Sequence, residues 1–215
     1  MSDRLDWKVW HHDYDDPDSS VSHRLVEVRA RLAGVLADGV GQVWLLSICA
    51  GDARDVIPVV AVSDCDVEVT LVELDPELAD RARRAADAAG VRVDVRTGDA
   101  GDPEVYAGLH PVDVLVMVGV LGNVSDADAR TTVAAAGSLV AEGGTVIWSR
   151  SNRFRAEPTH GYEDPAVWVR DLFEAQGFET VDYLRPDQDA WRLGVSRLAV
   201  PSRDPLPERI FTFVR

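Results

Sequence analysis

The chain has few cysteines and few basic residues, and each shortage excludes a class of protein. Its 215 residues include only Cys49 and Cys65, too few for a disulfide-stabilised secreted domain. Lysine and arginine number 22 against 37 aspartates and glutamates, which gives a formal net charge of −15. Nucleic acids and anionic membrane surfaces are bound by clustered basic side chains, so we expect neither as a partner.

Long apolar runs are also missing. The longest uncharged apolar stretch, residues 114–124, is too short to span a bilayer. The first ten residues include Asp3, Arg4, Asp6 and Lys8 and therefore contain no apolar signal region. Apolar residues nevertheless make up 46% of the chain, which is enough for one hydrophobic core. The sequence predicts a cytoplasmic protein with one main domain.

Apolar segments of strand length alternate with helical segments. Helices are predicted from Ser19 to the stop at Asp38-Gly39, after the first strand, and over 76–89, 126–142 and 164–176. Strands are predicted over 42–49, 67–74, 91–97, 112–118, 145–149, 178–184 and 191–200. Such alternation indicates an α/β fold, a three-layer doubly wound domain with a mostly parallel sheet. The last two strands have no helix between them, so we expect antiparallel pairing at one edge.

Features suited to a nucleoside ligand follow the first three predicted strands. Small residues over 49–53, between a strand and a helix, allow a ligand to approach the backbone closely. Glu73 stands 22 residues after Gly51, where a carboxylate can accept hydrogen bonds from both ribose hydroxyls. Asp99, in the turn Gly98-Asp99-Ala100, can reach an adenine amino group. In folds of this class, ligands bind at the carboxyl ends of the strands.

These segments resemble the class I S-adenosylmethionine-dependent methyltransferases, over nearly the whole chain from Ser19 onward. The resemblance runs through CAGDARD, VELDPELADRAR, RTGDA and VDVLVMVGVLGNV and continues in SNR and DLFEAQGF. It implies a seven-stranded sheet in a single domain over 19–215, with S-adenosyl-L-methionine as cofactor and S-adenosyl-L-homocysteine as product. The cofactor contacts that it implies are Ser47, Cys49, Ala50, Gly51, Asp52, Glu73, Leu74, Asp99, Ala100, Gly119 and Val120.

The cofactor loop departs from the usual family pattern of one acidic residue and three glycines at alternate positions. This chain has Ser47, Cys49, Gly51 and Ala53 there, so only the middle glycine is kept. We interpret the Cys-Ala-Gly-Asp sequence as a subfamily variant. Asp52 is a candidate to replace the missing acidic residue in holding the amino group of the cofactor. Cys49 is expected to be a small buried hydrophobe and not a nucleophile.

Residues 1–18 precede the predicted domain and contain three candidate catalytic residues, His11, His12 and Tyr14. In the superfamily, a leading segment often folds over the cofactor and shapes the acceptor pocket as a lid, where a histidine can take up a proton. A solvated tail docked by its tryptophans fits the same residues equally well. His160, the fourth candidate, lies in a long charged loop expected at the same rim.

The resemblance predicts methyl transfer to an oxygen or nitrogen of a small-molecule acceptor, without a metal. In-line displacement from a sulfonium needs mainly positioning, which can supply about 7–11 kcal/mol. The motif of nucleic-acid amino methyltransferases is missing after the fourth strand, which agrees with the acidic charge. The alternatives are an aminopropyltransferase-like enzyme and a non-catalytic S-adenosylmethionine-binding protein; a dinucleotide-dependent oxidoreductase fits Asp99 less well. We expect a monomer or a homodimer.

Overall fold

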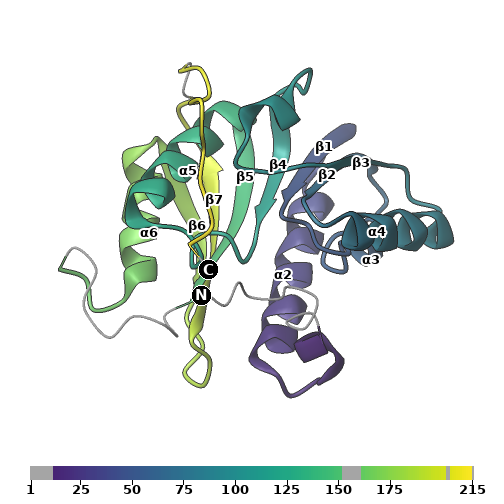
Figure 1. Cartoon of the computed structure of the whole chain (residues 1–215), viewed down its shortest axis with the longest axis horizontal. Helices are drawn as coiled ribbons and strands as arrows, with labels where there is room; N and C mark the ends of the chain where they lie inside the picture. Colours follow the sequence, from purple (N-terminus) through teal and green to yellow (C-terminus); the bar gives the residue numbers. More distant parts are fainter. Residues whose placement is uncertain (1–11, 152–160, 202–203, 215) are drawn as a thin grey trace.

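The computed structural model describes residues 12–151, 161–201 and 204–214, which fold around one seven-stranded sheet (Figure 1). The strands are β1 (Gln42–Ile48), β2 (Asp66–Glu73), β3 (Val93–Thr97), β4 (Val112–Met117), β5 (Val140–Ser151), β6 (Phe178–Leu184) and β7 (Trp191–Leu198). Their order is β3-β2-β1-β4-β5-β7-β6. Strands β1 to β5 pair in parallel, and β7 pairs antiparallel with both β5 and β6. The predicted doubly wound sheet with antiparallel pairing at one edge is therefore confirmed.

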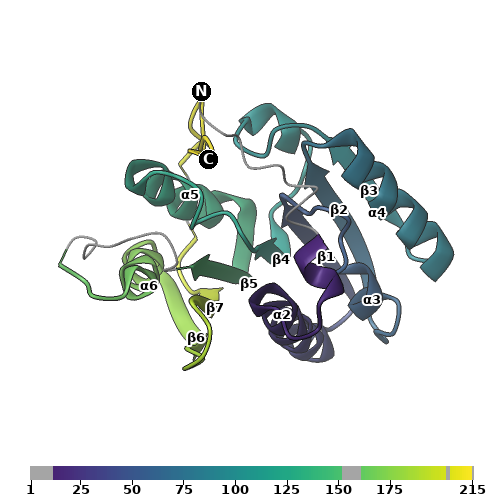
Figure 2. The same ribbon diagram turned by 60° about the horizontal axis from the view of Figure 1, so that its bottom comes forward.

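Helices cover both faces of this sheet (Figure 2). They are α2 (Ser20–Ala37), α3 (Ile57–Val60), α4 (Pro76–Ala89), α5 (Asp126–Leu139) and α6 (Pro165–Ala175), with short 3-10 helices η1 (His12–Asp15) and η2 (Pro103–Tyr106). One hydrophobic cluster joins α2, α3 and α4 to the sheet, and a second joins α5 and α6 to the opposite face. Among the described residues, no helix combines the length and the hydropathy needed to cross a membrane.

Strand β4 shows why the central strands consist of continuous apolar runs. Val114 and Val116 belong to the cluster beneath α2, whereas Leu115 and Met117 belong to the cluster beneath α5 and α6. All four side chains are at most 1% exposed. Because both faces of the strand are covered, every side chain of this run must be apolar, as in parallel sheets generally.

Helix α4 begins and ends at the predicted residues because both of its ends carry strong local signals. Asp75 caps the helix by accepting hydrogen bonds from the backbone N–H groups of Glu77 (2.8 Å) and Leu78 (3.2 Å). Gly90 follows the last turn in the left-handed conformation, with φ of 69°. Asp75 is therefore the N-cap of this helix.

Two predicted helices differ from the structure. Helix α5 ends at Leu139, and residues 140–144, predicted to be partly helical, begin strand β5. The Gly143-Gly144 pair lies within this strand, next to the point where its register against β4 shifts, and does not end a helix. A Cβ atom on Gly144 would lie 2.7 Å from a Val140 methyl, 2.9 Å from the carbonyl oxygen of Ala141 and 3.0 Å from that of Asp113, so this irregular part of the strand requires glycine. The helix predicted after β1 is reduced to the single turn α3.

Candidate functional site

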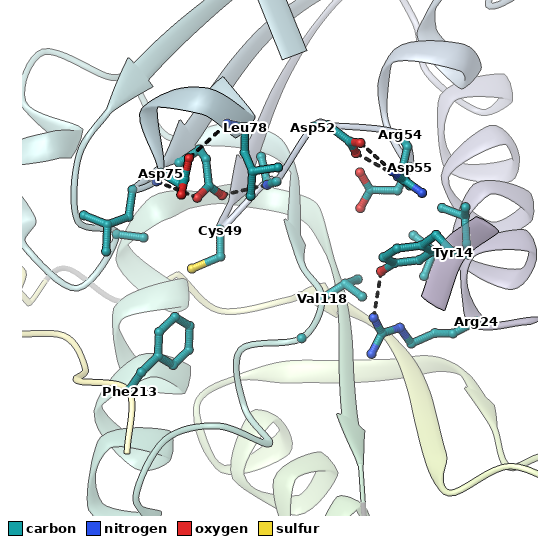
Figure 3. A pocket seen from close by; sticks show the side chains of 18 of the residues that line it. Tyr14, Arg24, Cys49, Asp52, Arg54, Asp55, Asp75, Leu78, Val118 and Phe213 are labelled. Atoms are coloured by element: carbon teal, nitrogen blue, oxygen red, sulfur yellow. Dashed lines mark hydrogen bonds and ion pairs between the residues drawn. The ribbon is translucent and has the colours of Figure 1, made fainter. Parts of the chain in front are cut away.

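A cavity of about 360 Å³ lies at the carboxyl ends of β1, β2, β3 and β4 (Figure 3). Nine of the eleven cofactor contacts predicted above line it: Cys49, Ala50, Gly51, Asp52, Glu73, Leu74, Asp99, Ala100 and Gly119. These residues come from four separate loops or strand ends. The topology therefore brings together the features that the sequence places after successive strands.

The other two predicted contacts, Ser47 and Val120, are not among the residues that line the cavity. Ser47 is 1% exposed and lies in the middle of the sheet, paired in register with Leu71 of β2 and Val116 of β4. Val120 is completely buried in the core beneath α5 and α6. A position inside a strand or the core leaves both side chains behind the cavity wall, so their role as cofactor contacts stays a prediction.

The loop after β1 has an unusual backbone. Cys49, Gly51 and Ala53 have φ values of 52°, 59° and 55°, so three alternate residues are left-handed. These are the three positions at which the family usually has glycine, which adopts this conformation without strain. For a residue with a Cβ atom, the left-handed conformation costs roughly 1–2 kcal/mol. The chain therefore keeps the backbone shape of a glycine-rich loop with one glycine, and such strain is common at ligand sites.

Glu73 fixes this loop to the end of β2. Its side chain is 8% exposed, and its carboxylate accepts hydrogen bonds from the backbone N–H groups of Gly51 (2.7 Å) and Asp75 (2.9 Å). Burial raises the pKa of Glu73, and the backbone hydrogen bonds oppose that rise. Each carboxylate oxygen has a second lone pair. Glu73 can thus hold the two loops together and still accept hydrogen bonds from a ribose.

Asp99 is fixed by two partners. One carboxylate oxygen accepts a hydrogen bond from the N–H of Gly101 (2.8 Å), and the other accepts one from the Arg209 guanidinium (2.7 Å). The Asp99 side chain is still 40% exposed at the cavity. The predicted contact of Asp99 with an adenine amino group would therefore use the remaining lone pairs of this carboxylate.

The C-terminal segment, residues 209–214, forms a wall of the cavity that sequence reasoning missed. The N–H of Ile210 donates to the carbonyl of Gly101, and the N–H of Val214 donates to the carbonyl of Asn123, both at 2.9 Å. The segment thus connects the loop after β3 to the loop after β4, and Phe213 reaches the cavity (Figure 3). The four apolar residues of RIFTFV, interrupted only by Thr212, were the available signal for a docked segment.

Gly101→Ala is expected to loosen this wall. An added Cβ atom would lie 2.1 Å from the carbonyl oxygen of Phe211 and 3.0 Å from the Arg209 guanidinium. Overpacking of this kind costs about 1–3 kcal/mol, measured as the free energy of unfolding in urea. The matched control is Gly34→Ala in α2, where nothing lies within 4 Å and helix propensity favours alanine. Equal unfolding midpoints for Gly101→Ala and the wild type would contradict the packing.

The opposite end of the cavity is polar and charged. The Arg24 guanidinium donates to the hydroxyl of Tyr14 (3.0 Å), and the Arg54 guanidinium lies over the Tyr14 ring, 4.6 Å from its centroid. Arg54 also donates two hydrogen bonds to the carboxylate of Asp52, at 2.8 and 2.6 Å. Asp52, the predicted ligand of the cofactor's amino group, therefore already forms a bidentate ion pair. Asp55, which was not predicted, also lines this end.

Among the candidate catalytic residues, Tyr14 lines the cavity. The backbone of His12 begins η1, but its side chain is outside what the structure describes. His11 and His160 also lie outside the described residues. The roles proposed for these histidines, and for residues 1–18 as a lid or a docked tail, stay predictions.

Cys49 directs its thiol into the cavity (Figure 3). Burial raises the pKa of this thiol strongly, and the charges of Glu73 and Asp99 raise it further. The thiolate is the nucleophilic form of cysteine, so this side chain stays protonated and unreactive at neutral pH. The raised pKa agrees with the interpretation of Cys49 as a hydrophobe and not a nucleophile, whereas the predicted full burial is not observed, because the side chain is partly exposed at the cavity.

Comparisons with known proteins relate part of this chain to a known family. Residues 45–144 match the family model of a methyltransferase domain. This match and the shared fold support the resemblance to the class I S-adenosylmethionine-dependent methyltransferases. No curated protein sequence matches the chain. The status of the Cys-Ala-Gly-Asp loop as a subfamily mark stays a prediction.

Solved structures share the fold at low sequence identity. An O-methyltransferase family protein from Burkholderia thailandensis is 19% identical, with a TM-score of 0.64 over 82% of this chain and 56% of that one. An O-methyltransferase family 2 protein from Planctomyces limnophilus, in complex with apigenin, is 20% identical, with a TM-score of 0.59 over 83% and 59%. The [4+2]-cyclase SpnF is 16% identical, with a TM-score of 0.58 over 79% and 81%. This chain thus spans less than two thirds of the first two proteins.

Proposed function

We propose that this protein uses S-adenosyl-L-methionine to methylate an oxygen or nitrogen atom of a small-molecule acceptor. The observation that carries the proposal is the single cavity formed by the left-handed loop at Gly51, the buried carboxylate of Glu73 and the loop at Asp99. The match of residues 45–144 to a methyltransferase domain supports the same reaction class.

The lining of the cavity fits the chemical parts of this cofactor. Leu74 is 62% exposed at the cavity, and Phe213 adds apolar surface that a purine ring can cover. Glu73 supplies acceptor oxygens for ribose hydroxyls, and the far end supplies charged groups for an amino acid. A volume of about 360 Å³ lies within the range of small-ligand pockets, roughly 300–1,000 Å³.

The catalytic work of the protein is then mainly positioning. When bound, the cofactor supplies an electrophilic methyl group on a positively charged sulfonium, which is already a good leaving group. The loop at Gly51 and Glu73 would hold the nucleoside, and Gly119 after β4 would lie beside the reacting atoms. Correct placement of donor and acceptor can supply about 7–11 kcal/mol without a covalent intermediate. A base is needed only for an acceptor that must lose a proton.

Two observations favour a small acceptor. The formal charge of −15 opposes the binding of nucleic acids, and the two O-methyltransferase relatives share the fold, one of them in complex with apigenin. The fold by itself does not fix the reaction, because the [4+2]-cyclase SpnF shares it. The acceptor must therefore be identified by assay.

The test combines binding and turnover. Titration calorimetry is expected to show binding of both S-adenosylmethionine and S-adenosylhomocysteine. Incubation with a panel of phenols, carboxylic acids and amines should then release S-adenosylhomocysteine only with the correct acceptor. Failure of both nucleosides to bind would overturn the proposal. Aminopropyl transfer from decarboxylated S-adenosylmethionine to a polyamine would instead establish the aminopropyltransferase alternative.

A further inference from the structure

The loop after β4 is held by hydrogen bonds at the residue that reaches the cavity, Gly119. The N–H of Gly119 donates to the hydroxyl of Ser149 at 3.1 Å, and its carbonyl accepts a hydrogen bond from the side-chain amide of Asn123 at 2.6 Å. Gly119 has a φ of 82°, and nothing lies within 4 Å of the position that a Cβ atom would take. No neighbouring side chain packs there, so the conformation of the loop at the cavity depends on Ser149 and Asn123.

Asn123 is held in turn by the C-terminal segment, residues 209–214. Its backbone carbonyl accepts a hydrogen bond from the N–H of Val214 at 2.9 Å. The next residue, Val124, forms an antiparallel bridge with Phe213, which lines the cavity (Figure 3). Asn123 is not among the residues that line the cavity, so it contacts the segment and the loop but does not reach a ligand.

The same segment is fixed to the loop after β3, which also lines the cavity. The N–H of Ile210 donates to the carbonyl of Gly101 at 2.9 Å, and Phe211 is 1% exposed in the core. Between these contacts and the bridge, the N–H of Thr212 donates to the carboxylate of Asp128 at 3.2 Å. Residues 209–214 thus connect two loops of the cavity through backbone hydrogen bonds along their length.

We propose that residues 209–214 position the loop after β4 for methyl transfer, with Asn123 as the positioning residue between this segment and Gly119. The inference rests on the proposed function, in which Gly119 lies beside the reacting atoms. In-line displacement depends on the alignment of donor and acceptor, so small displacements of the groups that position them lower the rate by large factors. The contacts of Asn123 therefore control the rate of methyl transfer and not the affinity for the nucleoside, which Glu73 and the loop at Gly51 hold.

Two substitutions break this linkage at separate points. Asn123→Ala removes the donor to Gly119, and Val214→Pro removes the N–H that donates to Asn123 but keeps Phe213 at the cavity. With S-adenosylmethionine and the acceptor found in the panel assay, each should lower the single-turnover rate about 5–10-fold, as expected for one lost hydrogen bond. The double variant should lose about tenfold in total, whereas independent effects would multiply to about 25–100-fold. The affinity for S-adenosylhomocysteine should stay within about twofold in all three variants, which also shows that they fold.

Hydrogen exchange measures the linkage without turnover. Val214→Pro should speed the exchange of amides in residues 119–124 at least about threefold, and Asn123→Ala should do the same for residues 209–214. The control Val40→Pro makes the same substitution at a position that is 94% exposed and should match the wild type in rate and affinity.

The outcomes separate the inference from the proposed function. Unchanged single-turnover rates, or a double variant whose loss equals the product of the single losses, would overturn the inference and leave the proposed function intact. Exchange as slow as in the wild type in both variants would overturn the linkage itself. Failure of the wild type to release S-adenosylhomocysteine with any acceptor would instead overturn the proposed function.

Discussion

Glu73→Ala is expected to lower the affinity for S-adenosylhomocysteine at least about 100-fold, measured by titration calorimetry. The substitution removes the carboxylate proposed to accept hydrogen bonds from the ribose, and hydrogen bonds to charged groups contribute about 1.5–3 kcal/mol each. It also removes the acceptor for the N–H of Gly51 at 2.7 Å, which holds the strained loop in place. The loss of affinity is therefore expected to be larger than that caused by removing a single ligand contact.

Two further variants separate the effect of the Glu73 carboxylate on binding from a general effect on the fold. Glu73→Gln keeps the size of the side chain, but its amide has one acceptor oxygen where the carboxylate has two, so an N–H of Gly51 or Asp75 loses its partner. We expect about a tenfold loss of affinity in this variant. Glu68→Ala removes an exposed glutamate from the same strand and should bind like the wild type. Equal affinity of Glu73→Ala and the wild type would contradict the assignment.

The sequence predicted most of the fold because the relevant signals are local. Apolar runs, the cap at Asp75 and the glycine at Gly90 lie within or next to the elements that they define. The boundary of α5 and β5 was predicted wrongly because the Gly143-Gly144 pair fits two structures, a helix stop or an irregular strand. Only the neighbouring strand decides between them, and its position is a tertiary property.

Part of the candidate site was also predictable from local signals in the sequence. Glu73 and Asp99 follow strands directly, so the parallel sheet was enough to bring them together. Arg24 belongs to a helix that precedes the sheet, and Phe213 lies more than 100 residues after Asp99 in the chain. Their positions depend on how distant segments pack, and no spacing in the sequence encodes that packing. Asp55 lay within the loop itself, but its carboxylate differs from that of Asp52 only through its partners.

The loop after β1 shows that a motif and the conformation it usually encodes are separable. Glycine at three alternate positions is one way to obtain three left-handed residues, and this chain obtains them with Cys49, Gly51 and Ala53. The strain at the two non-glycine residues is opposed by the hydrogen bond from Gly51 to Glu73 and by the complete burial of Ala53. A comparison of residue types alone therefore underestimates how closely the backbone of this loop resembles a glycine-rich loop.

Asp55→Asn is expected to stabilise the ligand-free protein at pH 8 by about 2–3 kcal/mol. The pKa of Asp55 rises from 3.8 to about 6 in the folded chain, because burial and the charge of Asp52 outweigh Arg24 and Arg29. The folded state therefore holds this proton more tightly than the unfolded state does. As pH rises from 3.8 to 6, the free energy of unfolding of the wild type falls, and each pKa unit contributes about 1.36 kcal/mol. Above pH 6 this loss of stability is complete. The Asp55→Asn variant does not undergo it, because asparagine does not ionise.

Urea unfolding of both proteins between pH 4 and pH 8 measures this effect. All other titrating groups are shared, so the difference between the two free energies of unfolding isolates Asp55 to first approximation. It should be near zero at about pH 4 and favour the variant increasingly up to about pH 6. A pH-independent difference, or a variant that is less stable than the wild type at pH 8, would contradict the raised pKa of Asp55.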